Sequence, residues 1–101
     1  MATEISDNPD ENRYEAVVDG ALAGFAVYRL QPGTIAFVHT EIEGELEGQG
    51  IGSTLVREAL EDVRRRGLAV LPYCPFVRSF IADHREFVDL VPAPRRDEFG
   101  L

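Results

Sequence analysis

The sequence predicts a single α/β domain with a mixed four-stranded sheet, one β-α-β crossover and a second helix. Three observations lead to this prediction: β-branched and aromatic runs separated by turn residues, one long amphipathic helical pattern, and a short apolar run directly after it. The chain has 101 residues, which is enough for one domain.

The first part of the chain predicts three antiparallel strands. Residues 13–18 and 21–30 are rich in Tyr, Val, Phe and Ala, and the Asp-Gly pair at residues 19–20 suits a two-residue hairpin turn that accepts positive φ. A Pro-Gly turn then leads into a β-branched and aromatic run at residues 34–42. Both faces of the middle strand are apolar, so we expect it to lie inside the sheet.

Residues 51–66 carry the helical pattern, with apolar side chains at helical spacing and charged residues on the other face. The helix should end at Gly67, because glycine is the usual residue for a left-handed C′ position. The apolar run at residues 68–73 follows at once, so its strand should lie parallel to residues 34–42.

The remaining segments are less strongly patterned. Pro75 suits the first turn of a second helix that ends near His84. Residues 85–91 fit a last helical turn or a short strand, and the sequence leaves both open. The predicted boundaries are a polar, acidic and disordered N-terminus at residues 1–12, a domain at residues 13–91 and a charged tail at residues 92–101.

Composition narrows the class of protein. The formal net charge is -8, so the mean field repels nucleic acid and anionic membrane surfaces and mildly favours a cationic substrate. One cysteine allows no intrachain disulfide, and residues 1–12 lack the apolar segment of a signal peptide. We therefore expect a cytoplasmic monomer or homodimer that binds neither nucleic acid nor membrane.

The glycine-rich segment Gly48-Gln49-Gly50-Ile51-Gly52 lies where a strand gives way to the long helix. Backbone N–H groups at a helix start have no intrahelical partner and lie at the positive end of the helix dipole, so a phosphate is the natural ligand. The glycines allow close approach, and Ser53 adds a hydroxyl donor. The spacing does not fit a P-loop or a dinucleotide fingerprint. The segment is either a phosphate-binding loop or a turn that only caps the helix.

The segment from Ile42 to Leu55, IEGELEGQGIGSTL, resembles the signature loop of GNAT (GCN5-related) N-acetyltransferases, which reads Arg or Gln, two residues, Gly, any residue, and Gly or Ala. Gly50 and Gly52 match its last two fixed positions, and Glu47 stands where the pattern has Arg or Gln. The resemblance covers roughly residues 13–91 and is closest to the minimal single-domain branch, marked by HTE before the loop and CPF after the fourth strand.

This resemblance implies a minimal GNAT-like fold and acetyl transfer from acetyl-CoA to an amine of a small molecule, a peptide or a protein. In this family the strand before the loop diverges from its neighbour, and its free backbone groups hold the pantetheine arm, which here implicates Glu41 and Ile42. No metal site is predicted. The remaining predicted CoA contacts are the loop residues Gly48, Gln49, Gly50, Ile51, Gly52 and Ser53.

Acetyl transfer to an amine requires a neutral amine, a polarised thioester carbonyl and a proton for the departing CoA thiolate. His39 and Glu41 are two residues apart on one strand, so they share a face and either can relay a proton from an ammonium substrate. The alternative is that both are solvated surface residues.

Two residues near the second helix are further catalytic candidates. Cys74 lies where the fourth strand ends and Pro75 opens the helix, so the helix dipole can stabilise a thiolate; a small buried side chain is the alternative. The minimal branch of the family carries a cysteine here that is considered a catalytic residue or acetyl acceptor. His84 falls near the tyrosine with which larger family members protonate the CoA thiolate, or it caps the end of the helix.

Three functions follow from these readings. The first is an acetyl-CoA-dependent N-acetyltransferase that acts on an unidentified amine. The second is a non-catalytic acyl-CoA-binding or protein-interaction module, which Glu47 and the absence of an unambiguous base favour. The third is a small structural protein without a ligand.

Overall fold

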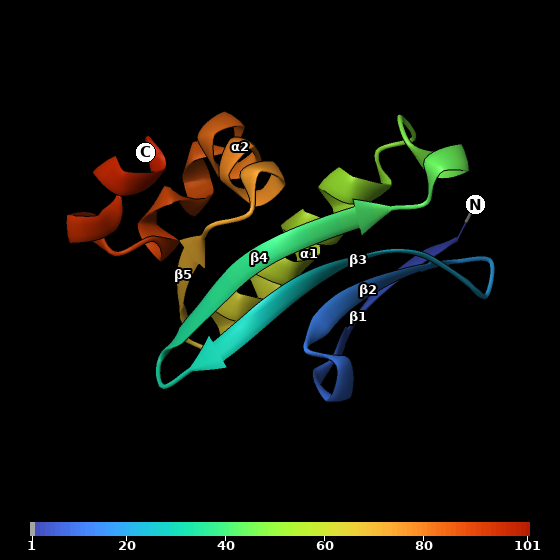
Figure 1. Ribbon diagram of the computed structural model, residues 1–101, viewed down its shortest axis with the longest axis horizontal. Helices are drawn as coiled ribbons and strands as arrows, with labels where there is room; N and C mark the ends of the chain where they lie inside the picture. The colour runs from blue at the N-terminus through green and yellow to red at the C-terminus, as the bar shows by residue number, and fades with distance from the viewer. Residues whose placement is uncertain (1) are drawn as a thin grey trace.

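The computed structural model describes residues 2–101 and shows one mixed sheet of five strands with a long helix along one face (Figure 1). The strands are β1 Thr3–Asn8, β2 Arg13–Val18, β3 Ala21–Gln31, β4 Thr34–Ile42 and β5 Ala69–Pro72; the α-helices are α1 Ile51–Arg65 and α2 Pro75–Asp83. The strand order in the sheet follows the chain, with β1 to β4 antiparallel and β5 parallel to β4. The predicted α/β class and the β-α-β crossover are confirmed.

The expected number of four strands is wrong, because residues that we expected to be disordered form β1. This strand pairs with β2 along its whole length, from Thr3 opposite Val18 to Asn8 opposite Arg13. Ile5 packs against the core from this strand. The polar composition of residues 1–12 does not predict a strand. Pairing with β2 and contacts with buried residues stabilise β1, rather than a hydrophobic pattern of its own.

The core lies between α1 and the sheet. Leu55, Leu60 and Val63 of α1 are fully buried, and they face Ile35 and the other apolar residues of the central strands. Three aromatic rings from three neighbouring strands add to this core, with centroid distances of 5.6, 6.2 and 6.4 Å; they belong to Tyr14, Tyr28 and Phe37. Because α1 buries one face against this sheet, its apolar residues recur at helical spacing in the sequence.

The hydroxyls of the two core tyrosines tie four elements together. Tyr28 donates to Asp7 Oδ1 of β1 at 2.6 Å, and Tyr14 donates to Asp62 Oδ2 of α1 at 2.6 Å. Arg66 Nη1 donates to Tyr14 Oη at 3.0 Å and to Asp7 Oδ2 at 3.3 Å. Every hydroxyl in this cluster is therefore satisfied, and β1 supplies one of the two carboxylates that the tyrosines need.

Burial raises the pKa of both Tyr14 and Tyr28, and the hydrogen bonds to Asp62 and Asp7 raise it further. The folded state thus keeps phenol protons that the unfolded chain releases near its ordinary tyrosine pKa of about 10. We expect full stability below about pH 10 and a falling melting temperature above it, measured by thermal unfolding. Tyr14→Phe should make this decline shallower, and an equally steep decline in the variant would contradict the assignment.

The segments around the helices settle two predictions. Gly67 follows α1 with a φ of 71°, as expected for a left-handed C′ residue. Residues 85–91, which the sequence left open, contain the 3-10 helix η3, Arg85–Leu90. The tail at residues 92–101 forms two further 3-10 turns, η4 Ala93–Arg95 and η5 Asp97–Phe99, and buries Phe99 against Tyr73. Within residues 2–101, no helix is long and apolar enough to cross a membrane.

A bulge between β3 and β4 decides which side chains reach the candidate site. Tyr28 is opposite Phe37, but Val27 is opposite His39, so Val38 is the extra residue. Beyond the bulge, His39 and Glu41 share the face of Val27 and Phe25, while Thr40 shares the face of the buried Ala26. In Figure 1, α1 crosses behind β3 and β4, whereas β1 to β3 carry no helix on the side toward the viewer.

Candidate functional site

The glycine-rich segment forms the connection between β4 and α1. After β4 the chain makes the 3-10 turn η2, Gly44–Leu46, and then passes through Gly48 and Gly50, whose φ angles of 84° and 79° lie in the left-handed region. Side chains rarely adopt this conformation, so both positions favour glycine. Gly50 is the N-cap residue of α1 and sets the direction in which the helix begins.

Free backbone donors gather at this helix start. The first helical hydrogen bond runs from the Thr54 N–H to the Gly50 carbonyl at 3.0 Å. Within residues 2–101, five amides just before it donate to no protein acceptor, those of Gly48, Gly50, Ile51, Gly52 and Ser53. Together with the positive end of the dipole of α1, they form the arrangement that binds phosphate groups.

These donors open into a pocket of about 400 Å³, which we call the glycine-loop pocket. Its remaining walls come from the end of β4, from η2 and from the first turn of α2. Five of the six predicted loop residues line it, and Gln49 does not; its amide donates to the Leu46 carbonyl at 3.4 Å. The lining residues are Thr40, Ile42, Leu46, Glu47, Gly48, Gly50, Ile51, Gly52, Ser53 and Phe76.

The end of β4 has a free edge toward this pocket. The pairing with β5 stops at Phe37 opposite Pro72, and the Cys74 N–H closes it by donating to the Phe37 carbonyl at 2.8 Å. Residues 38–42 therefore pair with β3 alone. The Glu43 N–H donates to Ala23, so by alternation Ile42 turns its backbone groups to the free edge and Glu41 turns its own toward β3.

Cys74 and Thr40 meet at the inner end of the pocket. Cys74 Sγ lies 3.3 Å from Thr40 Oγ1, and the cysteine is 3% exposed. Thr40 lines the pocket, whereas Cys74 does not, so the thiol reaches this space through the threonine hydroxyl. The thiol makes no cap to the amides of α2. Sequence reasoning missed Thr40 because it named the two residues on either side, which the bulge places on the opposite face.

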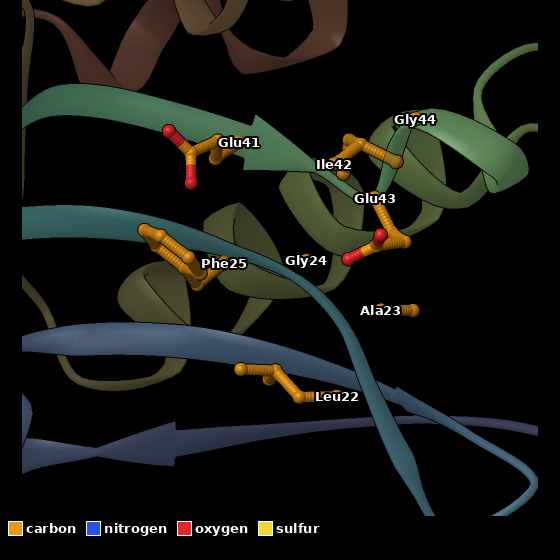
Figure 2. Close-up of a pocket in the computed structure, with 8 residues that line it drawn as sticks. All are labelled: Leu22, Ala23, Gly24, Phe25, Glu41, Ile42, Glu43 and Gly44. Atoms are coloured by element: carbon orange, nitrogen blue, oxygen red, sulfur yellow. The ribbon is translucent and has the colours of Figure 1, made fainter.

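His39 and Glu41 form a solvent-exposed pair on the helix-free face, with His39 Nε2 3.2 Å from Glu41 Oε1. Glu41 also lines a hollow of about 270 Å³ at the junction of β3 and β4, shown in Figure 2. The hollow contains two carboxylates and three large apolar side chains; it is lined by Leu22, Ala23, Gly24, Phe25, Glu41, Ile42, Glu43 and Gly44. Ile42 belongs to both linings, so the two spaces lie on either side of it.

His84 occupies the other end of α2. Its Nδ1 donates to the Phe80 carbonyl at 2.8 Å, and its ring stacks on Phe80 with a centroid distance of 4.0 Å. His84 lines neither the glycine-loop pocket nor the hollow. The contacts are those of a helix C-terminal residue, and a role in proton transfer stays a prediction.

The glycine-loop pocket and the hollow attract ligands of opposite charge. No lysine or arginine belongs to either lining. In the glycine-loop pocket an anion must therefore be held by backbone amides, against the exposed carboxylate of Glu47. In the hollow, Glu41 and Glu43 carry negative charge that no lining cation neutralises, which suits an ammonium group.

Comparison with known proteins identifies the family of this chain. A family model described as GCN5-related N-acetyl-transferase matches residues 13–90. No curated protein gives a match. Among solved structures, the NMR structure of a GCN5-like protein from Staphylococcus aureus has a TM-score of 0.68 at 24% identity, over 88% of this chain and 87% of that chain.

Two larger enzymes share the fold. The ribosomal-protein-S18-alanine N-acetyltransferase from Escherichia coli has a TM-score of 0.55 at 19% identity, over 57% of this chain and 38% of that chain. The ribosomal-protein-alanine N-acetyltransferase from Brucella melitensis biovar Abortus 2308 has a TM-score of 0.54 at 19% identity, over 80% of this chain and 61% of that chain. The match of the family model to most of the chain shows that the protein belongs to the GCN5-related N-acetyltransferase (GNAT) family and is an acetyltransferase.

Proposed function

We propose that the protein transfers an acetyl group from acetyl-CoA to a primary amine, with the cofactor in the glycine-loop pocket and the amine in the hollow of Figure 2. The observation that carries this proposal is the set of five unpaired amides at the start of α1, which open into a pocket of about 400 Å³. The diphosphate of CoA carries the charge and the acceptor oxygens that such donors bind.

The walls of the pocket indicate where the rest of the cofactor lies. From the amides, the pantetheine arm runs along the free edge of β4, where Ile42 offers unpaired backbone groups. Its thioester end then lies toward Thr40. Glu41 does not line the glycine-loop pocket and its backbone faces β3, so we place it on the acceptor side and not in the cofactor site.

The acceptor side is built to attract a cation. Glu41 and Glu43 draw an ammonium group into the hollow, and the apolar side chains of Leu22 and Phe25 accommodate the carbon chain that bears it. Glu41 accepts the ammonium proton, directly or through water, and His39 at 3.2 Å can pass it to solvent. The neutral amine then attacks the thioester carbon.

The departing CoA thiolate needs a proton, and of the two hydroxyl residues in the lining, Thr40 and Ser53, Thr40 is the one on β4. Its oxygen lies 3.3 Å from Cys74 Sγ, so the thiol can reprotonate the threonine as the threonine gives its proton to the thiolate. The proton that the attacking nitrogen loses as the amide forms then returns through Thr40 and restores the Cys74 thiol. The burial of Cys74 behind Thr40 favours direct attack by the amine over an acetyl-cysteine intermediate.

The test couples binding and turnover. Titration calorimetry with CoA measures the cofactor site, and release of free CoA from acetyl-CoA measures transfer to a panel of alkyl amines and peptides. Glu41→Gln should lower amine-dependent CoA release by about 100-fold and leave CoA affinity unchanged. Glu45→Gln is the matched control, because Glu45 is exposed in η2 and lines neither space.

Two results would overturn the proposal in different ways. If the protein binds CoA but no amine causes release of free CoA from acetyl-CoA, the chain is a non-catalytic acyl-CoA-binding module. Glu47 in the pocket wall and the burial of Cys74 favour this alternative. No heat of binding with CoA would remove the cofactor site altogether. Acetylation of Cys74, seen by mass spectrometry of protein incubated with acetyl-CoA alone, would replace direct attack by the acetyl-cysteine route.

Glu47→Gln is expected to tighten CoA binding, because it removes a carboxylate from the wall that faces the diphosphate. An exposed charge pair of this kind changes affinity about two- to fivefold at low salt. The gain should shrink as ionic strength rises, because salt screens exposed charges. Titration calorimetry at two salt concentrations measures it, and equal affinities of the two proteins at low salt would contradict it.

A further inference from the structure

Phe76 is exposed although it is a large aromatic residue. It occupies the second position of α2, and 42% of its surface is accessible. Only three other large apolar residues among residues 2–101 are exposed to this degree, Leu22, Leu30 and Tyr73. The Phe76 ring lines the glycine-loop pocket, so its accessible surface faces the space that we assign to the cofactor.

The tip of this ring rests on Gly52. A Cβ atom added to Gly52 would lie 2.7 Å from Phe76 Cζ and 3.3 and 3.4 Å from the two Cε atoms. Gly52 is helical and does not have the positive φ of Gly48 and Gly50, so its backbone does not require glycine. Glycine within a helix costs about 1 kcal/mol relative to alanine. The contact with Phe76 therefore accounts for a glycine that the phosphate-binding geometry alone leaves unexplained.

The first turn of α2 thus reaches both ends of the pocket. Cys74, at the N-cap position of this helix, contacts Thr40 at the end of β4. Phe76, two residues later, contacts Gly52 in the first turn of α1. The ring therefore shares one pocket with the amide donors and the Thr40 hydroxyl, and it contributes apolar surface there together with Ile42, Leu46 and Ile51.

We propose that Phe76 is a positioning residue for the acyl-CoA: its ring, seated on Gly52, is the wall that directs the pantetheine arm from the amides toward Thr40. This inference rests on the proposed function. It predicts that the pocket discriminates between CoA and phosphate-bearing ligands that have no such arm. Ligands of the second kind meet the amides alone.

The test compares two probes in wild type and Phe76→Ala. CoA carries a diphosphate and a pantetheine arm, and ADP carries a diphosphate without the arm. Loss of the apolar contact should weaken CoA about five- to tenfold. The affinity for ADP should stay the same. Leu30→Ala is the matched control, because Leu30 is 52% exposed and lines neither the pocket nor the hollow.

The outcomes separate this inference from the function on which it rests. If wild type binds CoA and Phe76→Ala binds it equally well, or loses CoA and ADP to the same degree, Phe76 does not position the arm, and the acetyltransferase assignment stands. If wild type does not bind CoA, both fail. A rise in KM for acetyl-CoA with little change in kcat would show that the ring acts on binding.

A double-mutant cycle with Gly52→Ala tests the seat of the ring independently of ligand. Gly52→Ala in wild type displaces the exposed Phe76 ring, so it should lower the affinity for CoA and raise the melting temperature less than helix propensity alone predicts. In the Phe76→Ala background the same change meets no ring, and the better helix propensity of alanine should raise the melting temperature. Identical effects of Gly52→Ala in the two backgrounds would contradict the contact and the proposal built on it.

Discussion

Gly24→Ala is expected to lower the melting temperature by about 5 to 20 °C, because overpacking of this kind costs about 1–3 kcal/mol in a domain of this size. A Cβ at residue 24 would lie 2.6 Å from Ile42 Cδ1 and 2.7 Å from the Glu41 carbonyl oxygen. The carbonyl belongs to the backbone of β4, so it cannot move away without disturbing the pairing of Gly24 with Ile42. Thermal unfolding followed by circular dichroism measures the effect.

Gly44→Ala is the matched control for this variant. A Cβ there meets no atom within 4 Å, and Gly44 does not have a positive φ. Its melting temperature should stay close to that of wild type, as for most surface substitutions. The Gly24 variant should also bind CoA less well, because Ile42 lines both the hollow and the glycine-loop pocket. Equal melting temperatures of the two variants would show that the strands do not approach as closely as described.

Gly50→Glu is expected to weaken CoA binding at least about fivefold relative to Gly50→Gln, because a like charge within a few ångströms of the diphosphate costs at least about 1 kcal/mol. Both variants place a side chain at a φ of 79°, so both carry the same backbone strain of about 1–2 kcal/mol. Their melting temperatures should fall together. Titration calorimetry then isolates the charge, and equal affinities would mean that the diphosphate does not lie at the start of α1.

Turn chemistry made much of the sheet predictable. The hairpin after β2 was placed correctly because Asp19 and Gly20 adopt the positive φ angles of 51° and 84° that its sequence suggested. The bounds of β4 were also correct, since a glycine turn precedes it and the loop follows it. The missed strand, β1, has one apolar residue in the core, Ile5. Its pairing with β2 and the hydrogen bond from Tyr28 to Asp7 are contacts between distant residues, which a local sequence pattern does not predict.

The sequence predicted the backbone amides of the candidate site but not all of its side chains. The loop from Gly48 to Ser53 could be read from glycine spacing before a helix. Thr40 could not, because the bulge at Val38 reverses the faces that simple alternation assigns to this strand. Phe76 falls in the predicted second helix, and only the approach of α2 to α1 shows that its ring rests on Gly52. Both residues depend on contacts between distant parts of the sequence.

The pairing of β1 with β2 bears on where this domain can be cut. The family match starts at Arg13, so a chain trimmed to the matched residues would lack Thr3–Asn8. Tyr28 would then lose its acceptor, Asp7, and an unpaired buried hydroxyl costs about 1–3 kcal/mol. β2 would become an open edge, available for pairing with other chains. The unit that folds without aggregating is therefore longer at its amino end than the region that the family model matches.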